Sequence, residues 1–489
     1  MLFNSIEFVL FFLPLTLLIY SFLRIWDKPF YAKSFLVLAS VIFYGWWKPI
    51  YVPLICGSII LNYLGSLLYH RGEKIAKITL ITGIVLNLGL LGYFKYFNFF
   101  LGNASQLFGG DFKGAHIALP LAISFFTFQQ IAYLIEAYRD RKAADSFLDY
   151  SLFVLFFPHL IAGPITHHKE MLPQFKEAGH GVIQPVYFSV GLTIFILGLA
   201  KKTLLADTAA LYADPFFDAA AAGQILTATA AWIGSLAYTF QLYFDFSGYS
   251  DMAIGLGLLF GIRLPVNFAS PYKATSIIDF WRRWHISLSR FLRNYLYFPM
   301  GGNRCGTSRR YVNLLLTMTI GGLWHGAGWT FAVWGALHGC YLVINHVLRR
   351  VVVVDNRMTK FAGWLLTFGA VVIGWVFFRA TSFSSAVAIV KAMATGVVTQ
   401  ADAYGVVVST PPVQAFFVVV VCAAIAFFSP SALEVVGYPK CIPEADGVET
   451  APLSPIVWKW TGGACVVGGI AAFVLAKLPD PGVFLYFNF

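Results

Sequence analysis

The sequence predicts an all-α, polytopic integral membrane protein with about 11–13 membrane helices, some of them re-entrant or broken. Apolar residues make up 58% of the chain and charged residues only 12%, whereas soluble proteins carry about 25% charged residues. Apolar runs of about 18–22 residues recur, the length that crosses a hydrocarbon core of roughly 30 Å. The runs are solidly apolar and lack the alternation of a transmembrane β-barrel.

Apolar segments along the chain give the candidate membrane elements. They are 5–23, 34–50, 51–69, 76–97, 117–138, 151–165, 185–205, 228–260, 312–328, 330–348, 361–378, 413–429 and 456–476. Segment 228–260 is expected to break, because FDFSGYSDMAIG places aspartates and glycines at its middle. Segment 151–165 contains Pro158 and Gly163-Pro164. We expect it to be re-entrant or strongly kinked, which is tolerated only where protein surrounds the backbone.

The first segment has no basic n-region and no small-residue cleavage site, so we expect a retained helix rather than a signal peptide. Basic residues follow the first, third and fifth segments, while the intervening loops carry few. The positive-inside rule then places the N-terminus outside and the Arg282–Arg310 region in the cytoplasm. No repeat or separate polar domain stands out, so residues 1–489 are expected to form a single membrane domain.

The net charge of +11 is explained by basic cytoplasmic loops, and we expect no nucleic-acid partner. The six cysteines are scattered singly without a C-x-x-C spacing, so no disulfide framework is expected. His159, His167 and His168 lack the supporting spacing of a metal site, and no metal is predicted. His338 and His346 fall on one helix, where core or interface roles are the more common explanation.

Most of the unusual chemistry lies in residues 278–328. Seven arginines fall between Arg282 and Arg310, beside two histidines, His285 and His325. His325 lies in an apolar stretch with glycines on both sides. An ionisable side chain at membrane depth is costly, so it indicates function. A neutral imidazole beside small residues could deprotonate a hydroxyl for attack on an acyl group; the alternative is a core histidine that is hydrogen-bonded between helices.

The stretch WRRWHISLS has two interpretations that remain open. At helical spacing Trp281, Trp284, His285 and Leu288 share one face, which would suit an interfacial amphipathic helix with arginines toward anionic headgroups. Alternatively, the arginines receive an anionic cofactor such as coenzyme A, since guanidinium groups bind phosphate bidentately.

The segment 243–251 places Asp245 and Asp251 within an apolar run. Such carboxylates could cap a broken helix or pair with an arginine. They could also orient a histidine, as carboxylates do in hydrolytic triads. The sequence leaves these alternatives open.

Four long motifs resemble the membrane-bound O-acyltransferase (MBOAT) family, specifically its bacterial branch of alginate and polysaccharide O-acetyltransferase membrane subunits. The matching stretches are Phe157–Pro164, Gln241–Gly255, Phe280–Ser289 and Gly321–Gly326. The likeness begins at Leu2-Phe3 and extends to Phe484–Phe489, so it covers essentially the whole chain.

The resemblance implies a ring of helices around a central tunnel. It also implies an acyltransferase of the bacterial inner membrane, which takes acetyl from cytosolic acetyl-CoA toward an extracytoplasmic polysaccharide. A periplasmic or membrane-tethered partner of the SGNH type would complete the transfer, and membrane lipids would surround the protein. The expected site has His325 and His285 as catalytic residues, Arg282, Arg283, Trp284 and Trp324 as acetyl-CoA contacts, and Asp245, Tyr249, Asp251 and Asn303 in support.

Three rival functions remain beside this interpretation. A D-alanyl-transferring relative that works with a carrier protein is similar in sequence. A transporter with a histidine proton relay would show inverted repeats, which we do not find. A non-catalytic scaffold would tolerate His325→Ala while its deletion abolished acetylation.

Overall fold

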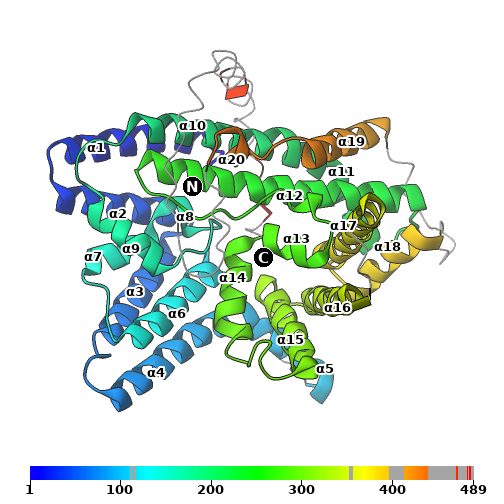
Figure 1. Ribbon diagram of the computed structural model, residues 1–489, viewed down its shortest axis with the longest axis horizontal. Coiled ribbons are helices and arrows are strands. Elements are labelled where there is room, and N and C mark those ends of the chain that lie inside the picture. Colours follow the sequence, from blue (N-terminus) through cyan, green and yellow to red (C-terminus); the bar gives the residue numbers. More distant parts are fainter. Residues whose placement is uncertain are drawn as a thin grey trace. The chain divides into compact units, whose positions relative to one another are not determined.

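The computed structural model describes residues 1–110, 114, 117–351, 356–395, 412–438, 468, 470–471, 482 and 484–485. These residues are mainly helical, and none of them forms a β-strand (Figure 1). Helices in six regions are long and apolar enough to cross a membrane: Glu7–Ile25, Pro49–Ser66, Glu73–Phe108, Pro185–Ala221, Trp329–Arg349 and Arg357–Arg379. Three apolar helices are shorter: Pro29–Gly45, Phe383–Thr395 and Val413–Phe428. The all-α polytopic class is confirmed, while the ring around a tunnel stays a prediction.

The chain divides into two compact units, each built from separated segments. Unit 1 comprises Met1–Leu199, Tyr249–Val266 and Val436–Val483, and unit 2 comprises Ala200–Gly248, Asn267–Val435 and Phe484–Phe489. Helix α12 (Ala228–Leu259) contributes residues to both units. The division does not test a single membrane domain over residues 1–489, which stays a prediction. The candidate span 456–476 lies almost entirely outside the described residues.

Unit 1 contains the N-terminal helices. Its elements are η1 (Glu7–Phe12), α1 (Leu13–Ile25), α2 (Pro29–Gly45), η2 (Pro49–Tyr51), α3 (Val52–Ser66), α4 (Glu73–Leu91), η3 (Gly92–Tyr96), α5 (Phe97–Phe108), α6 (Ile123–Asp140), α7 (Phe147–Leu155), α8 (Phe157–Leu160), α9 (His168–Glu177) and α10 (Pro185–Ala200). Helices α3, α4 and α6 pack together (Figure 1). Between them, Asn62 donates to Gln130 Oε1 at 2.8 Å and Asn87 donates to Asn62 Oδ1 at 2.7 Å. Buried amides in a membrane helix need such partners.

The kink predicted for 151–165 is confirmed. Helix α7 ends at Leu155 and α8 begins at Phe157, because Phe156 takes φ −49° and ψ 107°. The freed N–H of Phe157 donates to Ser40 Oγ at 3.1 Å, and all of these residues are buried. The broken backbone is therefore surrounded by protein, as its depth in an apolar region requires.

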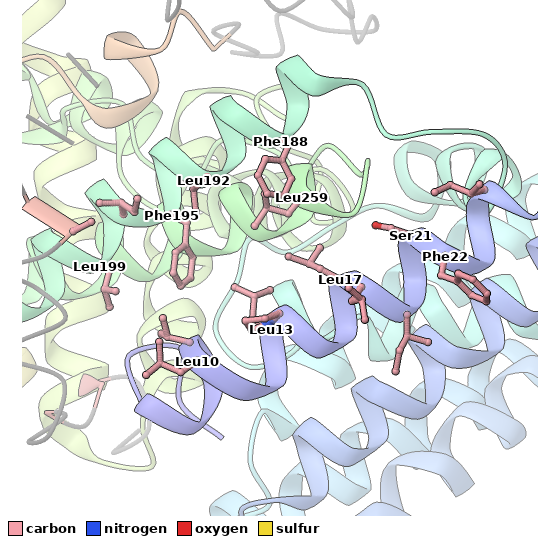
Figure 2. Close-up of a pocket in the computed structure, with 17 residues that line it drawn as sticks. Leu10, Leu13, Leu17, Ser21, Phe22, Phe188, Leu192, Phe195, Leu199 and Leu259 are labelled. Atoms are coloured by element: carbon pink, nitrogen blue, oxygen red, sulfur yellow. The ribbon is translucent and has the colours of Figure 1, made fainter. Parts of the chain in front are cut away.

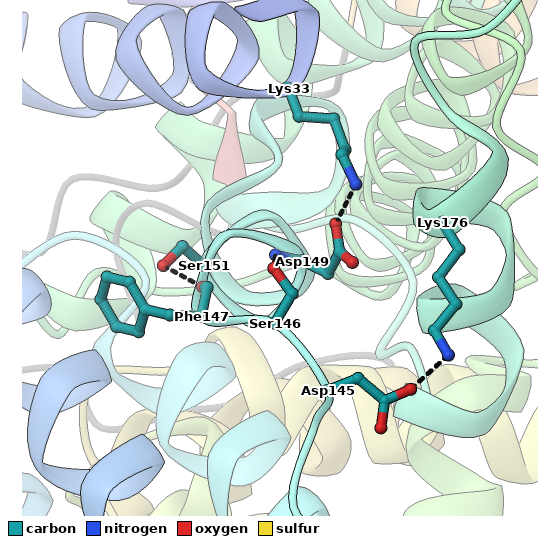
Figure 3. A network of polar contacts seen from close by, with 7 residues as sticks. All are labelled: Lys33, Asp145, Ser146, Phe147, Asp149, Ser151 and Lys176. Atoms are coloured by element: carbon teal, nitrogen blue, oxygen red, sulfur yellow. Dashed lines mark hydrogen bonds and ion pairs between the residues drawn. The ribbon is translucent and has the colours of Figure 1, made fainter. Parts of the chain in front are cut away.

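Charged side chains fasten the start of α7 to its neighbours in unit 1 (Figure 3). Ser146 caps the helix by accepting from the N–H of Asp149 at 3.3 Å, and Lys33 pairs with the Asp149 carboxylate at 2.7 Å. On the loop before the helix, the ammonium groups of Lys176 and Lys142 hold the pKa of Asp145 below its usual range. The cap satisfies an N–H of the first turn that would otherwise lack an intrahelical acceptor.

An apolar hollow of about 1010 Å³ lies in unit 1 along α1, α10 and the last turns of α12 (Figure 2). Leucines and phenylalanines line it, and Ser21 is its one hydroxyl-bearing lining residue among the described part of the chain. Side chains such as Leu18 and Phe22 are more than half exposed there. Such a surface suits contact with hydrocarbon better than contact with water.

Unit 2 contains the motif-rich part of the chain. Its elements are η4 (Lys201–Ala206), α11 (Asp207–Ala221), the first part of α12, η5 (Pro271–Lys273), α13 (Ile277–Arg283), α14 (Ile286–Leu292), η6 (Arg293–Tyr297), α15 (Thr307–His325), α16 (Trp329–Val351), α17 (Arg357–Arg379), α18 (Phe383–Thr395), α19 (Val413–Phe428) and α20 (Ala432–Val435). Helix α16 packs against α13, α15 and α17. Their buried side chains form one hydrophobic core that is rich in tryptophan and phenylalanine.

The break predicted within 228–260 is wrong. Helix α12 runs without interruption from Ala228 to Leu259. Asp245 is fully enclosed and pairs with Lys202 at 2.7 Å instead of capping a helix end. A carboxylate that is neutralised by a lysine does not have to leave the helix to find a partner.

Candidate active site

His325 is the last residue of α15, and a short glycine-containing turn leads from it into α16. Gly326 at the turn is extended, with φ −157° and ψ 147°, and so ends the helix. A Cβ built on Gly326 would lie 2.1 Å from the Phe331 ring. Only glycine therefore fits where the chain reverses next to His325.

Helices α15 and α16 approach each other through glycines on their facing sides. A Cβ on Gly322 would lie 2.2 Å from Phe331 O, and one on Gly335 would lie 2.3 Å from Met318 O. Small residues allow backbones to come this close, which is a common way to pack helices in membranes. This close packing brings the first turns of α16 against the end of α15.

The His325 side chain is buried among aromatic rings of unit 2. Its ring centroid lies 5.2 Å from Trp334, 5.2 Å from Phe378 and 4.9 Å from Trp324. The His285 ring lies 6.4 Å away. The structure thus brings together the two histidines that the sequence singles out, although forty positions separate them.

His285 stands at a sharp break between two short helices. Helix α13 ends at Arg283, and His285 takes a left-handed conformation with φ 42° before α14 begins at Ile286. The prediction that Trp281, Trp284 and His285 share one face of a continuous helix is therefore wrong. Left-handed backbone is uncommon in a residue with a side chain and often marks a functional position.

Asn267 fixes the orientation and tautomer of His285. Its Oδ1 accepts from the N–H of Ser287 at 3.3 Å and lies 3.1 Å from Nδ1 of His285. Because a backbone N–H identifies this atom as the amide oxygen, Nδ1 of His285 must donate to it. The lone pair of a neutral His285 therefore sits on Nε2, and burial without a carboxylate at this contact favours the neutral form.

The predicted acetyl-CoA contacts fall into different environments. Arg282 is exposed, whereas Arg283 pairs with Asp279 at 2.9 Å within the helix. Trp284 is 3% exposed and its ring lies 4.8 Å from Trp375, inside the aromatic core. Trp324 is equally buried and lies beside His325. Binding of acetyl-CoA by these four residues stays a prediction.

Asp245 belongs to a buried ionic cluster of unit 2. Lys202 lies 2.7 Å from both Asp207 and Asp245, and the N–H of Leu485 donates to Asp245 at 3.0 Å. Of the alternatives left open by the sequence, pairing with an arginine is therefore wrong for Asp245, because its cation is Lys202.

The other predicted supporting residues are Tyr249, Asp251 and Asn303. Tyr249 and Asp251 belong to unit 1, where the Tyr249 ring stacks on Phe3 at 4.9 Å. Asn303 is exposed in the loop before α15. The side-chain amide of Asn313, on α15, holds this loop in place by donating to Met300 O at 3.1 Å and to Gly302 O at 3.0 Å. Functional support by Tyr249, Asp251 and Asn303 stays a prediction.

Several other histidines have polar partners in the described part of the chain. His167 and His168 lie 3.3 Å and 3.0 Å from the carboxylate of Glu136, and His346 lies 2.7 Å from Arg310. His338 lies on α16 with His346, as predicted for one continuous helix. Within the described ranges, no group of three or more histidine, cysteine, aspartate or glutamate side chains could hold a metal ion.

The sequence model of the membrane-bound O-acyltransferase family matches residues 79–387, more than half of the chain and the whole stretch that contains both histidines. The chain belongs to this family. It is therefore a multi-pass membrane acyltransferase.

Relatives in the membrane-bound O-acyltransferase family cover most of the chain. The peptidoglycan O-acetyltransferase of Helicobacter pylori is 47% identical over 425 residues, 80% of this chain and 80% of that protein. The probable alginate O-acetylase AlgI of Pseudomonas aeruginosa is 45% identical over 401 residues, 80% of this chain and 75% of that protein. The teichoic acid D-alanyltransferase of Streptococcus thermophilus is 29% identical over 53% of this chain and 68% of that protein.

Sequence reasoning missed three residues of this region. Asn267 binds His285, which follows it by 18 positions (285 − 267). Lys202 binds Asp245, which follows it by 43 positions (245 − 202). Trp334 lies against His325 from the next helix. The one available signal for Asn267 and Lys202 was that each is a polar residue within an apolar stretch. This signal does not indicate which residue each of them binds.

Proposed function

We propose that this acyltransferase takes acetyl groups from acetyl-CoA at the cytoplasmic face of the bacterial inner membrane and supplies them for O-acetylation of an extracytoplasmic polysaccharide. A periplasmic or membrane-tethered partner of the SGNH type would complete the transfer to the sugar. The observation that carries the chemistry is the pair of buried imidazoles, His325 and His285, with ring centroids 6.4 Å apart.

Similarity to relatives supports acetyl as the transferred group. The relatives at 47% and 45% identity are named for O-acetylation of peptidoglycan and alginate. The relative named for D-alanylation is 29% identical over about half of the chain. Both named acetylation acceptors are cell-envelope or secreted polysaccharides, so a polysaccharide hydroxyl is the acceptor class we favour.

In the proposed reaction His325 acts on the acceptor hydroxyl. As a general base it takes the hydroxyl proton while the oxygen attacks the thioester carbonyl. The new C–O bond forms, the C–S bond breaks, and the thiolate of coenzyme A leaves and takes up a proton. If His325 instead accepts the acetyl group first, a C–N bond forms as the C–S bond breaks and the thiolate of coenzyme A leaves. The acceptor oxygen then forms its C–O bond as the C–N bond breaks and the imidazole is released.

His285 would assist from the opposite side of the site. Asn267 holds its Nδ1–H, so Nε2 can accept a proton or a hydrogen bond from the acceptor group. With their ring centroids 6.4 Å apart, the two imidazoles would both contact one acceptor hydroxyl in this scheme. This arrangement resembles other acyl-transfer sites in which one group positions and another takes the proton.

The exposed arginines of unit 2 would receive the donor. Arg282, Arg304 and Arg309 are exposed on or near α13 and the loop before α15. The positive-inside rule places this region in the cytoplasm, where acetyl-CoA is made available. Guanidinium groups bind the phosphates of coenzyme A, while an uncharged acetyl thioester enters the aromatic interior.

The decisive experiment measures glycan O-acetylation in cells that carry His325→Ala in place of the native residue. We expect loss of ester-linked acetate at normal membrane abundance, because in this scheme His325 takes the acceptor proton and His285 only assists. The control is His70→Ala, which removes an exposed histidine of unit 1 and should leave acetylation intact.

Retained acetylation in His325→Ala would overturn the catalytic assignment and favour a scaffold. Membranes that hold the full system should also transfer label from radiolabelled acetyl-CoA to glycan or partner. Label that enters only from D-alanine would overturn acetyl as the group transferred.

A further inference from the structure

The apolar hollow of unit 1 lies between two membrane helices (Figure 2). One wall is formed by η1 and α1, from Val9 to Ile25, and the other by α10, from Phe188 to Leu199. No described residue that lines the hollow is charged. Both walls belong to regions that are long and apolar enough to cross a membrane, so its occupant comes from the hydrocarbon phase of the bilayer.

The dimensions of the hollow fit acyl chains better than a helix. From Val9 to Ile25 the first wall extends for about 24 Å, at 1.5 Å per residue. The volume of 1010 Å³ divided by this length gives a mean cross-section of about 42 Å². A helix about 10 Å wide needs about 80 Å². Carbon atoms in contact lie about 4 Å apart, so two acyl chains fit side by side.

One end of the hollow, where Ile25 lies, is positively charged. The neighbouring Arg24 is buried. Its guanidinium donates to the carbonyl oxygens of His180 and Gly181 and to the hydroxyl of Tyr20. All three acceptors are neutral, and among the described residues no carboxylate pairs with Arg24. Its positive charge is therefore not compensated locally and attracts an anion to this end.

Lys28 adds an accessible cation, three positions beyond the last lining residue of α1. It is exposed, and within the described part of the chain no side chain pairs with its ammonium group. The carboxylate of Asp27 lies 2.7 Å from His180 Nδ1 instead. Trp26 and Tyr31 are exposed nearby, as aromatic rings often are at a membrane–water interface. An ammonium group at that depth meets lipid phosphates.

We propose that one anionic phospholipid of the phosphatidylglycerol class binds in this hollow, with its acyl chains between α1 and α10 and its phosphate at Lys28. The apolar walls take the chains and the basic end takes the phosphate. The hydroxyl-bearing Ser21 lines the hollow one turn before Ile25, where it can donate to an ester carbonyl of the lipid. The positive-inside rule assigns this end to the cytoplasmic leaflet. The lipid fills a space between the helices that side chains leave open.

Native mass spectrometry of the full-length protein in detergent tests the headgroup preference. Delipidated protein receives equal amounts of phosphatidylglycerol and phosphatidylethanolamine with identical acyl chains. We expect one retained phospholipid, with phosphatidylglycerol preferred. Lys28→Gln should reduce this preference about fivefold, the worth of one basic residue near an anionic lipid. Lys77→Gln removes another exposed lysine of unit 1, on α4, and should leave the preference unchanged.

Tryptophan substitutions test the location of the lipid. Leu192→Trp on α10 and Leu18→Trp on α1 place a larger ring in the hollow, so each should lower the retention of both lipids several-fold. Both leucines are exposed, so the fold should tolerate the larger side chain, and the melting temperature in detergent checks this. Leu61→Trp is the matched control, because Leu61 is exposed on α3 and does not line the hollow.

Three results would overturn the proposal. Phosphatidylglycerol retained at the unsubstituted level in both Leu192→Trp and Leu18→Trp would exclude the hollow as the binding site. Equal retention of the two lipids by the unsubstituted protein would exclude recognition of the anionic headgroup. A photo-reactive amino acid in place of Leu17, which also lines the hollow, should cross-link to lipid in intact cells. A cross-link to a protein instead would assign the hollow to a partner helix.

Discussion

At the scale of single residues, the chemistry of His285 is set by a neighbour that is no acid or base. The Asn267 side chain accepts from His285 Nδ1 and from Ser287, whose Oγ donates at 2.9 Å. The side-chain oxygen thereby holds the imidazole in one tautomer and one rotamer. Residues that orient a reacting imidazole are often as important to the rate as the contacts that surround it.

Asn267→Ala is expected to lower kcat for acetyl transfer about 10–100-fold, the usual cost of losing an orienting partner. KM for acetyl-CoA should change little, because Asn267 does not face the donor in the proposed site. Steady-state kinetics on purified protein measure the two constants separately.

Ser287→Ala provides the comparison for this change. It removes one hydrogen bond to Asn267 but leaves the His285 contact, so kcat should fall only slightly. An unchanged kcat in Asn267→Ala, with normal melting temperature, would contradict the assigned role of Asn267.

Residue types alone predicted the two histidines but not their partners. His325 stands out because an imidazole in an apolar stretch is costly. Asn267 and Lys202 also stand out as polar residues in apolar stretches, but their partners His285 and Asp245 come near them only when the chain folds. Tertiary structure decides which distant buried polar groups pair. The hydrophobic periodicity of a sequence predicts local helices and does not indicate such pairs.

At the scale of elements, hydropathy located helices better than it located their ends. The predicted spans 330–348 and 361–378 correspond to α16 and α17. The break expected in α12 is absent because an ion pair replaces the cap. The break at His285 was missed because no proline or glycine marks it, and a left-handed histidine is held there by contacts from Asn267.

The glycines between α15 and α16 determine how closely His325 approaches Trp334. In Gly335→Ala the new Cβ would lie 2.3 Å from the backbone oxygen of Met318, so the helices must separate. Overpacking of this kind costs about 1–3 kcal/mol of stability. We expect a lower melting temperature in detergent and a clear loss of acetyl transfer.

Gly328→Ala is the matched substitution in the same hairpin. Its Cβ would meet no atom closer than 3.5 Å, so both melting temperature and activity should be retained. Normal activity in Gly335→Ala would show that the spacing of α15 and α16 does not control the site.

At the scale of the whole molecule, one buried ionic cluster ties together distant parts of unit 2. Lys202 comes from η4, Asp207 from α11, Asp245 from α12, and Leu485 from near the chain end. Lys202 also lies 4.8 Å from the centre of the Phe484 ring. The cluster therefore links three helical segments and the C-terminal residues through a single lysine.

Substitution of Lys202 should lower the stability of the protein by far more than the ion pair itself contributes to that stability. Lys202→Met would leave the Asp245 carboxylate, 3% exposed, without its cation. Breaking a buried pair in this way costs about 3–5 kcal/mol, because the remaining charge is uncompensated. We expect a large fall in melting temperature in detergent. Asp207, at 29% exposure, can still be hydrated, so the penalty arises mainly from Asp245.

Two further variants separate charge from packing. Adding Asp245→Asn to Lys202→Met removes the uncompensated charge and should restore much of the lost stability. Lys391→Met, at an exposed position of α18, should have almost no effect because exposed ion pairs and single charges contribute little. If the double variant were no more stable than Lys202→Met, the loss would stem from the lysine's packing and not from the buried carboxylate. The tie between Lys202 and the C-terminal residues would then be steric.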